Sequence, residues 1–180
     1  MESRCSMKTS VVVRTALPVA AVAAMLVACR LEVAPPRERV PSTRGADTTM
    51  ILAELRTYYR DFSARNWTAF AGHFWTGADI TTVWQPPGED TGRVVATSIP
   101  EFVAQAPRGP DSRAIFEERM LDARITTTGD LAQAWVRYRA AFGNPGRVSE
   151  WDGTDAFTLL RHGGRWRIAS LVFLASGPGS

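Results

Sequence analysis

The chain has 180 residues, a length that suits one ordinary domain. Its hydrophobic content of 45% and its six tryptophans provide for a real core and argue against general disorder. The net charge is +3, but 14 Arg and 15 acidic residues nearly balance from residue 46 onward. The predicted domain therefore lacks the basic signature of a nucleic-acid-binding protein, and we expect no nucleic-acid partner.

Residues 1–28 predict the signal peptide of a bacterial lipoprotein. Three basic residues precede an apolar run at 15–27, which is too short to span a hydrocarbon core of about 30 Å at about 1.5 Å per residue. The letters LVAC that end at Cys29 resemble the bacterial lipobox, which implies cleavage before Cys29 and acylation of that residue. An ordinary secretion signal with a chance cysteine is the alternative, and translation could start at Met1 or Met7.

The residues after Cys29 indicate where the protein works. Arg30 stands where enteric bacteria place the aspartate that retains a lipoprotein in the inner membrane, so the resemblance implies the outer membrane in a Gram-negative host. Residues 29–46 hold three prolines and predict an extended tether. We therefore predict an exported protein that contacts a membrane through its lipid anchor, with a domain at 47–175 and a flexible tail at 176–180.

The first part of the domain predicts two helices. Asp47 can cap a first helix, along which apolar residues recur at helical spacing as far as Phe62. Asn66 can cap a second, shorter helix that ends in Phe74.

The remaining elements are one more helix and a set of strands. A strand is predicted at 78–84, and Ser98 with Glu101 forms a capping-box pattern for a third helix, which Pro107 ends. Alternating apolar and polar residues between glycine-containing turns then predict long strands. These lie at 114–127, 131–142, 154–161 and 165–174. Helices followed by long antiparallel strands indicate an α+β fold.

This order of elements resembles the nuclear transport factor 2-like superfamily. Two stretches are similar to its SnoaL-like members, YYRDFSARNWTAFAGHFWTGADITTVW at 58–84 and GTDAFTLLRHGGRWRI at 153–168. The resemblance implies a cone-shaped α+β fold, in which three N-terminal helices pack in a curved, mostly antiparallel sheet and leave a pocket. It also implies a homodimer. Function stays open, because the superfamily holds isomerases, dehydratases, cyclases, epoxide hydrolases and many non-enzymes.

Ketosteroid isomerases of this superfamily need a carboxylate base, a tyrosine and a protonated aspartate that hydrogen-bond the enolate. The resemblance puts Tyr59 at the tyrosine and Asp155 at the protonated aspartate. Gln85 stands where the base is expected, and an amide cannot take a proton at neutral pH, so the isomerase reaction is disfavoured. Tyr59 also fits an ordinary core position, and Asp155 also fits a residue that bonds the sheet or the first helix.

His73 is the candidate acid–base group, because histidine titrates near neutral pH and pairs readily with a carboxylate such as Asp155 or Asp79. A half-exposed histidine at a helix end is the alternative, and Asp79 also fits a turn. His162 stands beside two glycines and is expected in a turn. We expect no cofactor and no metal, since the domain has two separated histidines, no cysteine and no glycine-rich phosphate loop.

We therefore predict a domain that binds a small, mostly apolar molecule or a partner without catalysis. An isomerase, dehydratase or cyclase that uses His73, Asp155 and Tyr59 is the alternative, and an envelope scaffold or dimerisation module is the third possibility. The predicted pocket residues are Tyr59, Phe74, Trp84, Gln85 and Asp155.

Overall fold

The computed structural model describes residues 43–85 and 90–176 of the chain. The predicted signal peptide, Cys29 and most of the predicted tether lie outside these residues. Within the described ranges, no helix combines the length and the apolar character that crossing a membrane requires.

Helix α1 spans Thr43–Ser63 and buries one side against the sheet. Its apolar residues recur every three or four positions, which places them on one face of a helix. The predicted cap at Asp47 is wrong, because α1 begins upstream at Thr43 and Asp47 lies inside the helix. The carboxylate of Asp47 is buried and accepts a hydrogen bond from Arg161 Nη1 at 2.6 Å, which accounts for an acidic residue at this position.

Helix α2 spans Trp67–Gly72 and is capped by Asn66, as predicted. The Asn66 side chain accepts a hydrogen bond from a backbone amide of the first turn at 3.2 Å. The predicted end at Phe74 is wrong, because His73 is the C-cap and Phe74 opens strand β1. The aromatic and β-branched residues that follow Phe74 favour an extended strand over a further helical turn.

Helix α3 spans Ile99–Gln105 and begins at the predicted capping box. The hydroxyl of Ser98 accepts a hydrogen bond from the Glu101 amide at 3.4 Å, and the Glu101 carboxylate accepts one from the Ser98 amide at 3.1 Å. Two short 3-10 turns follow over residues 106–112, so the α-helical run ends before Pro107.

The described residues contain six strands, which form one sheet in the order β2-β1-β6-β5-β4-β3. Neighbouring strands are antiparallel except β1 and β6, which are parallel, so the sheet is mixed and mostly antiparallel. The strands are β1 (Phe74–Trp84), β2 (Arg93–Ser98), β3 (Ile115–Thr128), β4 (Leu131–Asn144), β5 (Arg147–His162) and β6 (Arg165–Ser176).

Two features of the sheet depart from the sequence prediction. Strand β2 is an edge strand that pairs only with β1, and its Val94 is 73% exposed, so the usual alternation of buried and exposed residues is weak there. Strand β5 begins at Arg147 instead of residue 154, because it pairs with β4 from its first residue onward.

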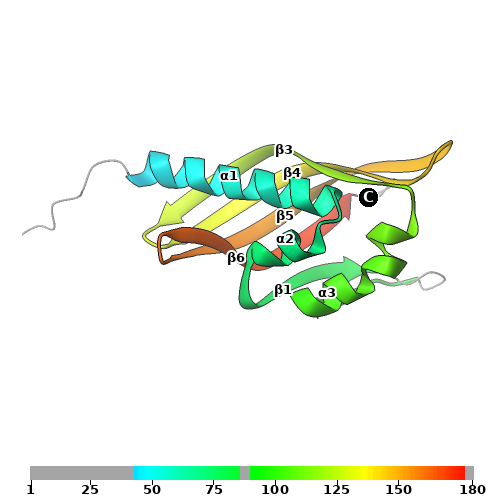
Figure 1. Cartoon of the computed structure of the whole chain (residues 1–180), viewed down its shortest axis with the longest axis horizontal. Helices are drawn as coiled ribbons and strands as arrows, with labels where there is room; N and C mark the ends of the chain where they lie inside the picture. Colours follow the sequence, from blue (N-terminus) through cyan, green and yellow to red (C-terminus); the bar gives the residue numbers. More distant parts are fainter. Residues whose placement is uncertain (1–42, 86–89, 177–180) are drawn as a thin grey trace, which may run out of the picture. The chain divides into compact units, whose positions relative to one another are not determined.

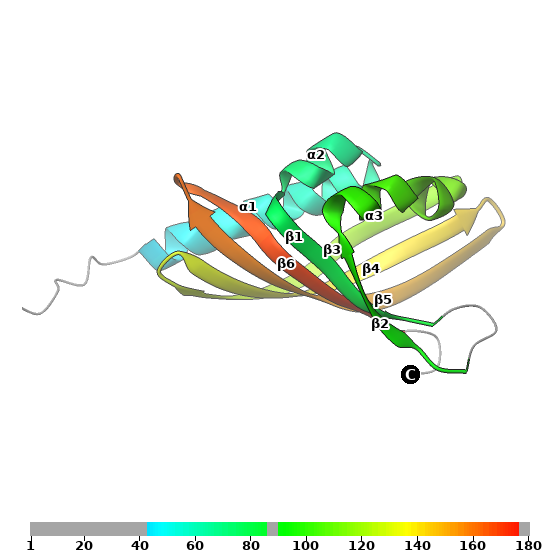
Figure 2. The same ribbon diagram turned by 90° about the horizontal axis from the view of Figure 1, so that it is seen from below.

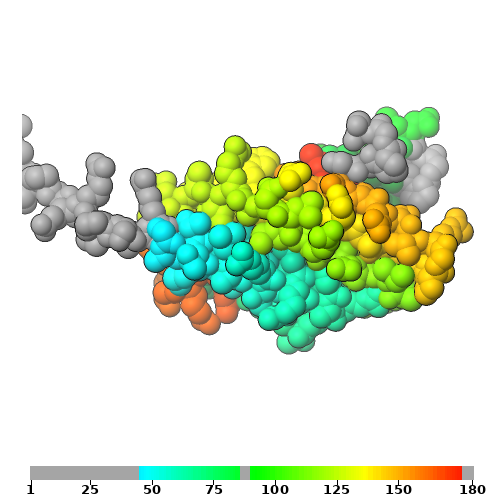
Figure 3. Space-filling view, turned by 90° about the horizontal axis from the view of Figure 1, so that it is seen from above, coloured from blue at the N-terminus to red at the C-terminus, as the bar shows by residue number. Residues whose placement is uncertain are grey.

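All three helices lie on one side of the curved sheet (Figures 1 and 2). Helix α1 runs along the sheet, and α2 and α3 lie near the β1 edge (Figure 2). In the space-filling view, the first half of α1 in cyan lies between the yellow-green residues of β3 and the orange residues of the β5–β6 hairpin (Figure 3). This is the cone-shaped α+β fold that the sequence resemblance implies.

The core lies between α1 and the inner face of the sheet. The ring centroid of Tyr58 lies 5.5 Å from that of Phe70 and 5.3 Å from that of Phe157, and both phenylalanines are fully buried. Burying an aromatic side chain contributes about 1.5–3 kcal/mol. The cluster thus fixes α1 on the sheet and sets the position of the next residue in the chain, Tyr59.

Candidate functional site

A small cavity of about 40 Å³ lies between α1 and the inner face of the sheet. Its walls are mostly apolar, with two carboxyl groups and two tyrosines among them. The lining contains no Arg, Lys or His. The lining residues are Tyr58, Phe62, Ile80, Phe102, Glu118, Tyr138, Asp155, Leu171 and Phe173.

Asp155 lines this cavity and is held by Tyr59. The Tyr59 hydroxyl on α1 donates a hydrogen bond to Asp155 Oδ2 on β5, and both residues are buried. Burial raises the pKa of Asp155 to about 7, although the hydrogen bond from Tyr59 acts in the opposite direction. Burial, followed by the charge of Asp155, raises the pKa of Tyr59, so its hydroxyl keeps its proton.

Glu118 is a cavity residue that the sequence analysis missed. It lies on β3 opposite the buried Ala140 of β4. Burial, and then the charge of Asp155, raise the pKa of the Glu118 carboxyl well above its ordinary value. The signal was present in the sequence, since Glu118 alternates with Phe116 and Met120 and therefore shares their face of the strand.

Tyr138 completes the polar part of the wall because its neighbour on β5 is a glycine. Tyr138 pairs with Gly153, and a Cβ atom at Gly153 would overlap the ring and the hydroxyl of Tyr138. The missing side chain therefore gives Tyr138 its room. Burial, and then Glu118 and Asp155, raise the pKa of Tyr138, so this hydroxyl is also protonated.

A groove of about 460 Å³ adjoins the cavity beside α3, β1 and β2. Ile80, Phe102 and Phe173 line both spaces, so the two are neighbours. At the outer part of the groove the guanidinium of Arg93 lies 5.5 Å from the ring centroid of Trp84, which is 47% exposed. The arrangement offers a largely apolar trough with carboxyl groups at its inner end.

The structure brings together only part of the predicted pocket. Tyr59 bonds Asp155 at the cavity, and Trp84 lines the adjoining groove. Phe74 is buried in the aromatic core, and Gln85 follows β1 as an exposed residue. Neither Phe74 nor Gln85 lines the cavity or the groove.

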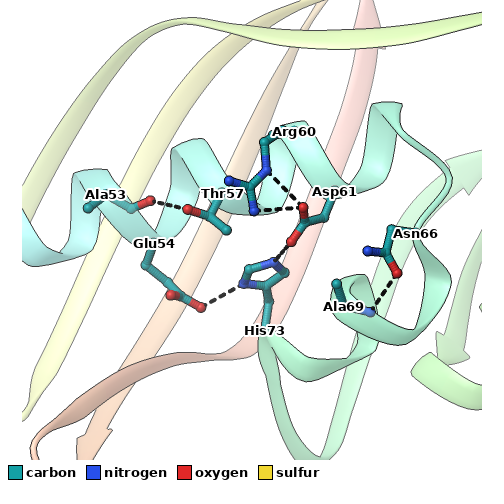
Figure 4. A network of polar contacts seen from close by, with 8 residues as sticks. All are labelled: Ala53, Glu54, Thr57, Arg60, Asp61, Asn66, Ala69 and His73. Carbon is teal, nitrogen blue, oxygen red and sulfur yellow. Dashed lines mark hydrogen bonds and ion pairs between the residues drawn. The ribbon is translucent and has the colours of Figure 1, made fainter.

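His73 belongs to a different site, where it points toward Glu54 and Asp61 of α1 (Figure 4). Its Nδ1 lies 2.8 Å from Glu54 Oε1 and its Nε2 lies 3.1 Å from Asp61 Oδ2. Asp61 also accepts a hydrogen bond from Arg60 Nε at 2.9 Å. The expectation of a half-exposed histidine is wrong, because the short α2 returns the chain to α1 and His73 is only 7% exposed.

The two carboxylates set the charge of His73. Burial lowers its pKa, but the hydrogen bonds to Glu54 and Asp61 outweigh this effect and the pKa is raised. Burial would raise the pKa of Asp61, but hydrogen bonds from Arg60 and His73 lower it. The protonated His73 side chain therefore links the start of β1 to α1 through ion pairs with Glu54 and Asp61.

A shallow cavity of about 450 Å³ borders this network and is separate from the one that holds Asp155. Arg165 and Arg167 of β6 line it together with His73. The structure thus does not assemble His73, Asp155 and Tyr59 into one acid–base site, which corrects the residue set of the predicted enzyme alternative.

Two further candidates lie away from both cavities' polar groups. Asp79 is not a turn residue, because it lies within β1 and pairs with Ser98 at the end of the β1–β2 ladder. His162 is exposed at the end of β5 beside the turn of two glycines. Over residues 43–85 and 90–176, no three His, Cys, Asp or Glu side chains form a group that could hold a metal ion.

No family model matches this sequence, and no curated protein matches it. Solved structures do match. An NTF2-like protein with a cystatin-like fold from Novosphingobium aromaticivorans has a TM-score of 0.60 at 13% identity, and the match covers 76% of this chain and 86% of that one. A putative scytalone dehydratase from the same species has a TM-score of 0.59 at 10% identity, with 74% and 86% covered.

A hexachlorocyclohexane dehydrochlorinase matches to the same degree, with a TM-score of 0.59 at 12% identity and coverage of 74% of this chain and 87% of that one. Identities this low speak for the fold and leave the activity open. Together with the helix order and the curved six-stranded sheet, these matches show that the described part of the chain has the nuclear transport factor 2-like cone fold.

Proposed function

We propose that this protein binds a small, mostly apolar molecule that carries an oxygen acceptor. The apolar part would lie in the groove, and the oxygen would point to the inner cavity. The observation that supports this most directly is the buried hydrogen bond between Tyr59 and Asp155 at the wall of a mostly apolar cavity. Ligand sites are commonly apolar clefts with a few polar groups that fix orientation.

The direction of the Tyr59–Asp155 bond specifies what Asp155 can offer. The Tyr59 hydroxyl donates its hydrogen bond to Oδ2 of Asp155. With a pKa of about 7, Asp155 carries a proton at slightly acid pH, and that proton is then available on Oδ1 as a donor. A carbonyl, ether or hydroxyl oxygen is the matching ligand group.

The dimensions support a ligand whose polar end is small. The cavity of about 40 Å³ admits little more than a functional group, whereas the groove of about 460 Å³ falls within the usual range of roughly 300–1,000 Å³ for ligand pockets.

A second candidate function is an isomerase or dehydratase that moves one proton. The pKa of Asp155, about 7, suits a general acid or base near neutral pH. The named dehydratase and dehydrochlorinase among the similar structures are consistent with elimination chemistry in this fold. In this enzyme Asp155 would transfer the proton with the help of Tyr59, and His73 would remain a structural residue. Chemical conversion of a bound molecule, as opposed to its release unchanged, would distinguish the two functions.

Native mass spectrometry of the full chain tests the binding function. A retained small molecule is expected with the wild type, and the double variant Tyr59→Phe, Asp155→Asn should stay folded by calorimetry and retain less of it. Asp152→Asn, an exposed position on the same strand, is the matched control and should retain as much as the wild type. Equal retention by the double variant, or its unfolding, would contradict a binding role for the pair.

We also propose that the chain is exported and anchored to a membrane through Cys29. The support is the lipobox-like sequence that ends at this residue, with a charged region and a short apolar run before it.

For the outer face of the sheet we propose a second copy of this chain as partner. Trp135 and Val172 lie in one row across β4, β5 and β6, with Ala156 between them, and are 50% and 46% exposed. Sedimentation of Trp135→Glu against the wild type tests the pairing. A wild type that sediments as a monomer would exclude it.

A further inference from the structure

The backbone of Glu118 is held in place by α1, and this positions its side chain at the cavity wall. The Ser63 hydroxyl at the end of α1 donates a hydrogen bond to the Glu118 carbonyl oxygen at 2.7 Å and accepts one from the Glu118 amide at 2.8 Å. This double contact holds β3 against α1. The alternation of the strand then turns the Glu118 side chain to the inner face, where it lines the cavity beside Tyr138 and Asp155.

The Glu118 carboxyl differs from that of Asp155 in its hydrogen bonding. Asp155 accepts a hydrogen bond from Tyr59, whereas the Glu118 side chain has no hydrogen-bond partner among the residues that the structure describes. Glu118 is half-buried, and a polar side chain without a partner at a cavity wall is suited to meeting a ligand.

The groups that face Glu118 favour its neutral form. They are Tyr58 and Tyr59 of α1, Tyr138 of β4 and Asp155 of β5, and none of them is cationic. Burial and the nearby Asp155 raise its pKa well above the ordinary value, in agreement with this geometry. A protonated carboxyl donates one hydrogen bond through its O–H. An anionic ligand would bring a negative charge into a space whose lining holds no cation.

We propose that Glu118 is a second hydrogen-bond donor in this cavity, and that with Asp155 it selects neutral ligands with an acceptor oxygen over carboxylates of the same shape. This inference rests on the proposed binding function and specifies the ligand class of the same site. No polar residue of β3 was predicted in the pocket, and Gln85, which was, does not line the cavity.

Two probes of matched length test the selection: 2-octanone, a neutral ketone, and octanoate, its anionic counterpart. Both are titrated into the full chain at about pH 6 and followed by amide chemical shifts. We expect 2-octanone to bind with shifts around Phe102 and Phe173, and octanoate to bind at least about tenfold more weakly, because a buried charge without a partner is costly.

Variants at Glu118 separate the donor from the shape of the side chain. Glu118→Met removes the donor at similar volume and should weaken 2-octanone binding about 3- to 10-fold. Glu118→Gln keeps a donor and should bind within about twofold of the wild type. Glu117→Gln is the matched control, because Glu117 is exposed on the outer face of the same strand.

The outcomes distinguish this inference from the function on which it rests. Equal affinity of the wild type for the two probes, or full 2-octanone binding by Glu118→Met while Tyr59→Phe binds less, would overturn the role of Glu118 and leave the binding function intact. Failure of the wild type to bind 2-octanone would overturn both. The comparison of the two probes on the wild type decides the question even if Glu118→Met does not fold.

Discussion

The hydroxyl of Tyr59 donates a hydrogen bond to Oδ2 of Asp155, a residue 96 positions later in the chain. One partner belongs to α1 and the other to β5, so the bond joins the first helix to the middle of the sheet. Because both side chains are buried, water does not compete for either partner. The bond therefore fixes the direction in which the Asp155 carboxyl meets the cavity.

Replacing Asp155 by Asn should flatten the dependence of stability on pH. The folded pKa of about 7 lies above the ordinary value of 3.8, so the folded state holds this proton more tightly than the unfolded state. The wild type should then lose free energy of unfolding as the pH rises from about 4 through 7, by on the order of 3 kcal/mol from this group. Urea denaturation at pH 4 to 8 measures the slope, and parallel curves for wild type and Asp155→Asn would refute the assignment.

His73→Gln should destabilise the domain at low pH more than at high pH. The pKa of His73 is raised by Glu54 and Asp61, so its stabilising charge is fully present below about 6.5 and is lost as the pH rises through the raised value. We expect a cost of about 1–3 kcal/mol at pH 6 that shrinks by pH 9. Thermal and urea unfolding measure it, with the exposed His162→Gln as control. A destabilisation that grows with pH would contradict a stabilising role for the charged form of His73.

Gly153→Ala should disturb the cavity through Tyr138. The added Cβ would overlap the Tyr138 ring, and overpacking of this kind costs about 1–3 kcal/mol. The double variant Gly153→Ala, Tyr138→Leu should recover part of that loss, as denaturant titration would show. Gly72→Ala is the control, because no atom lies within 4 Å of a Cβ at that position. Full stability of Gly153→Ala would mean that Tyr138 is free to move.

Cys29→Ser should abolish lipidation and leave a soluble or unprocessed chain. The thiol of this residue is the acceptor that the lipobox-like sequence implies, and stable anchoring needs the acyl chains. Labelled palmitate and membrane fractionation measure the effect. Cys5→Ser, the other cysteine of the chain, should be labelled as the wild type is. Label that still enters Cys29→Ser would disprove the anchor.

The sequence predicted the elements well wherever a local signal exists. Asn66 and Ser98 cap their helices through side-chain contacts within three residues, and such contacts are legible in the chain itself. The same holds for β4, whose alternation gives its buried face directly. The edge strand β2 escaped prediction because it buries little.

The site was less accessible to sequence reasoning. Tyr59 and Asp155 were singled out through resemblance, whereas Glu118 was not singled out on the strand predicted at 114–127. The sequence predicted a pair of His73 with Asp155 or Asp79, but the partners of His73 are two carboxylates of α1. Each of these outcomes depends on which face of an element meets which neighbour.

The sequence by itself determined the α+β class, the caps and turns, and the aromatic residues that form the core, because these follow from local propensity and periodicity. Only the tertiary structure decided that Asp155 and Glu118 share a cavity while His73 lies outside it. The physical reason is that proximity across strands and helices depends on register and packing. Burial at those positions, and not the residue type, then sets the charge of each carboxyl.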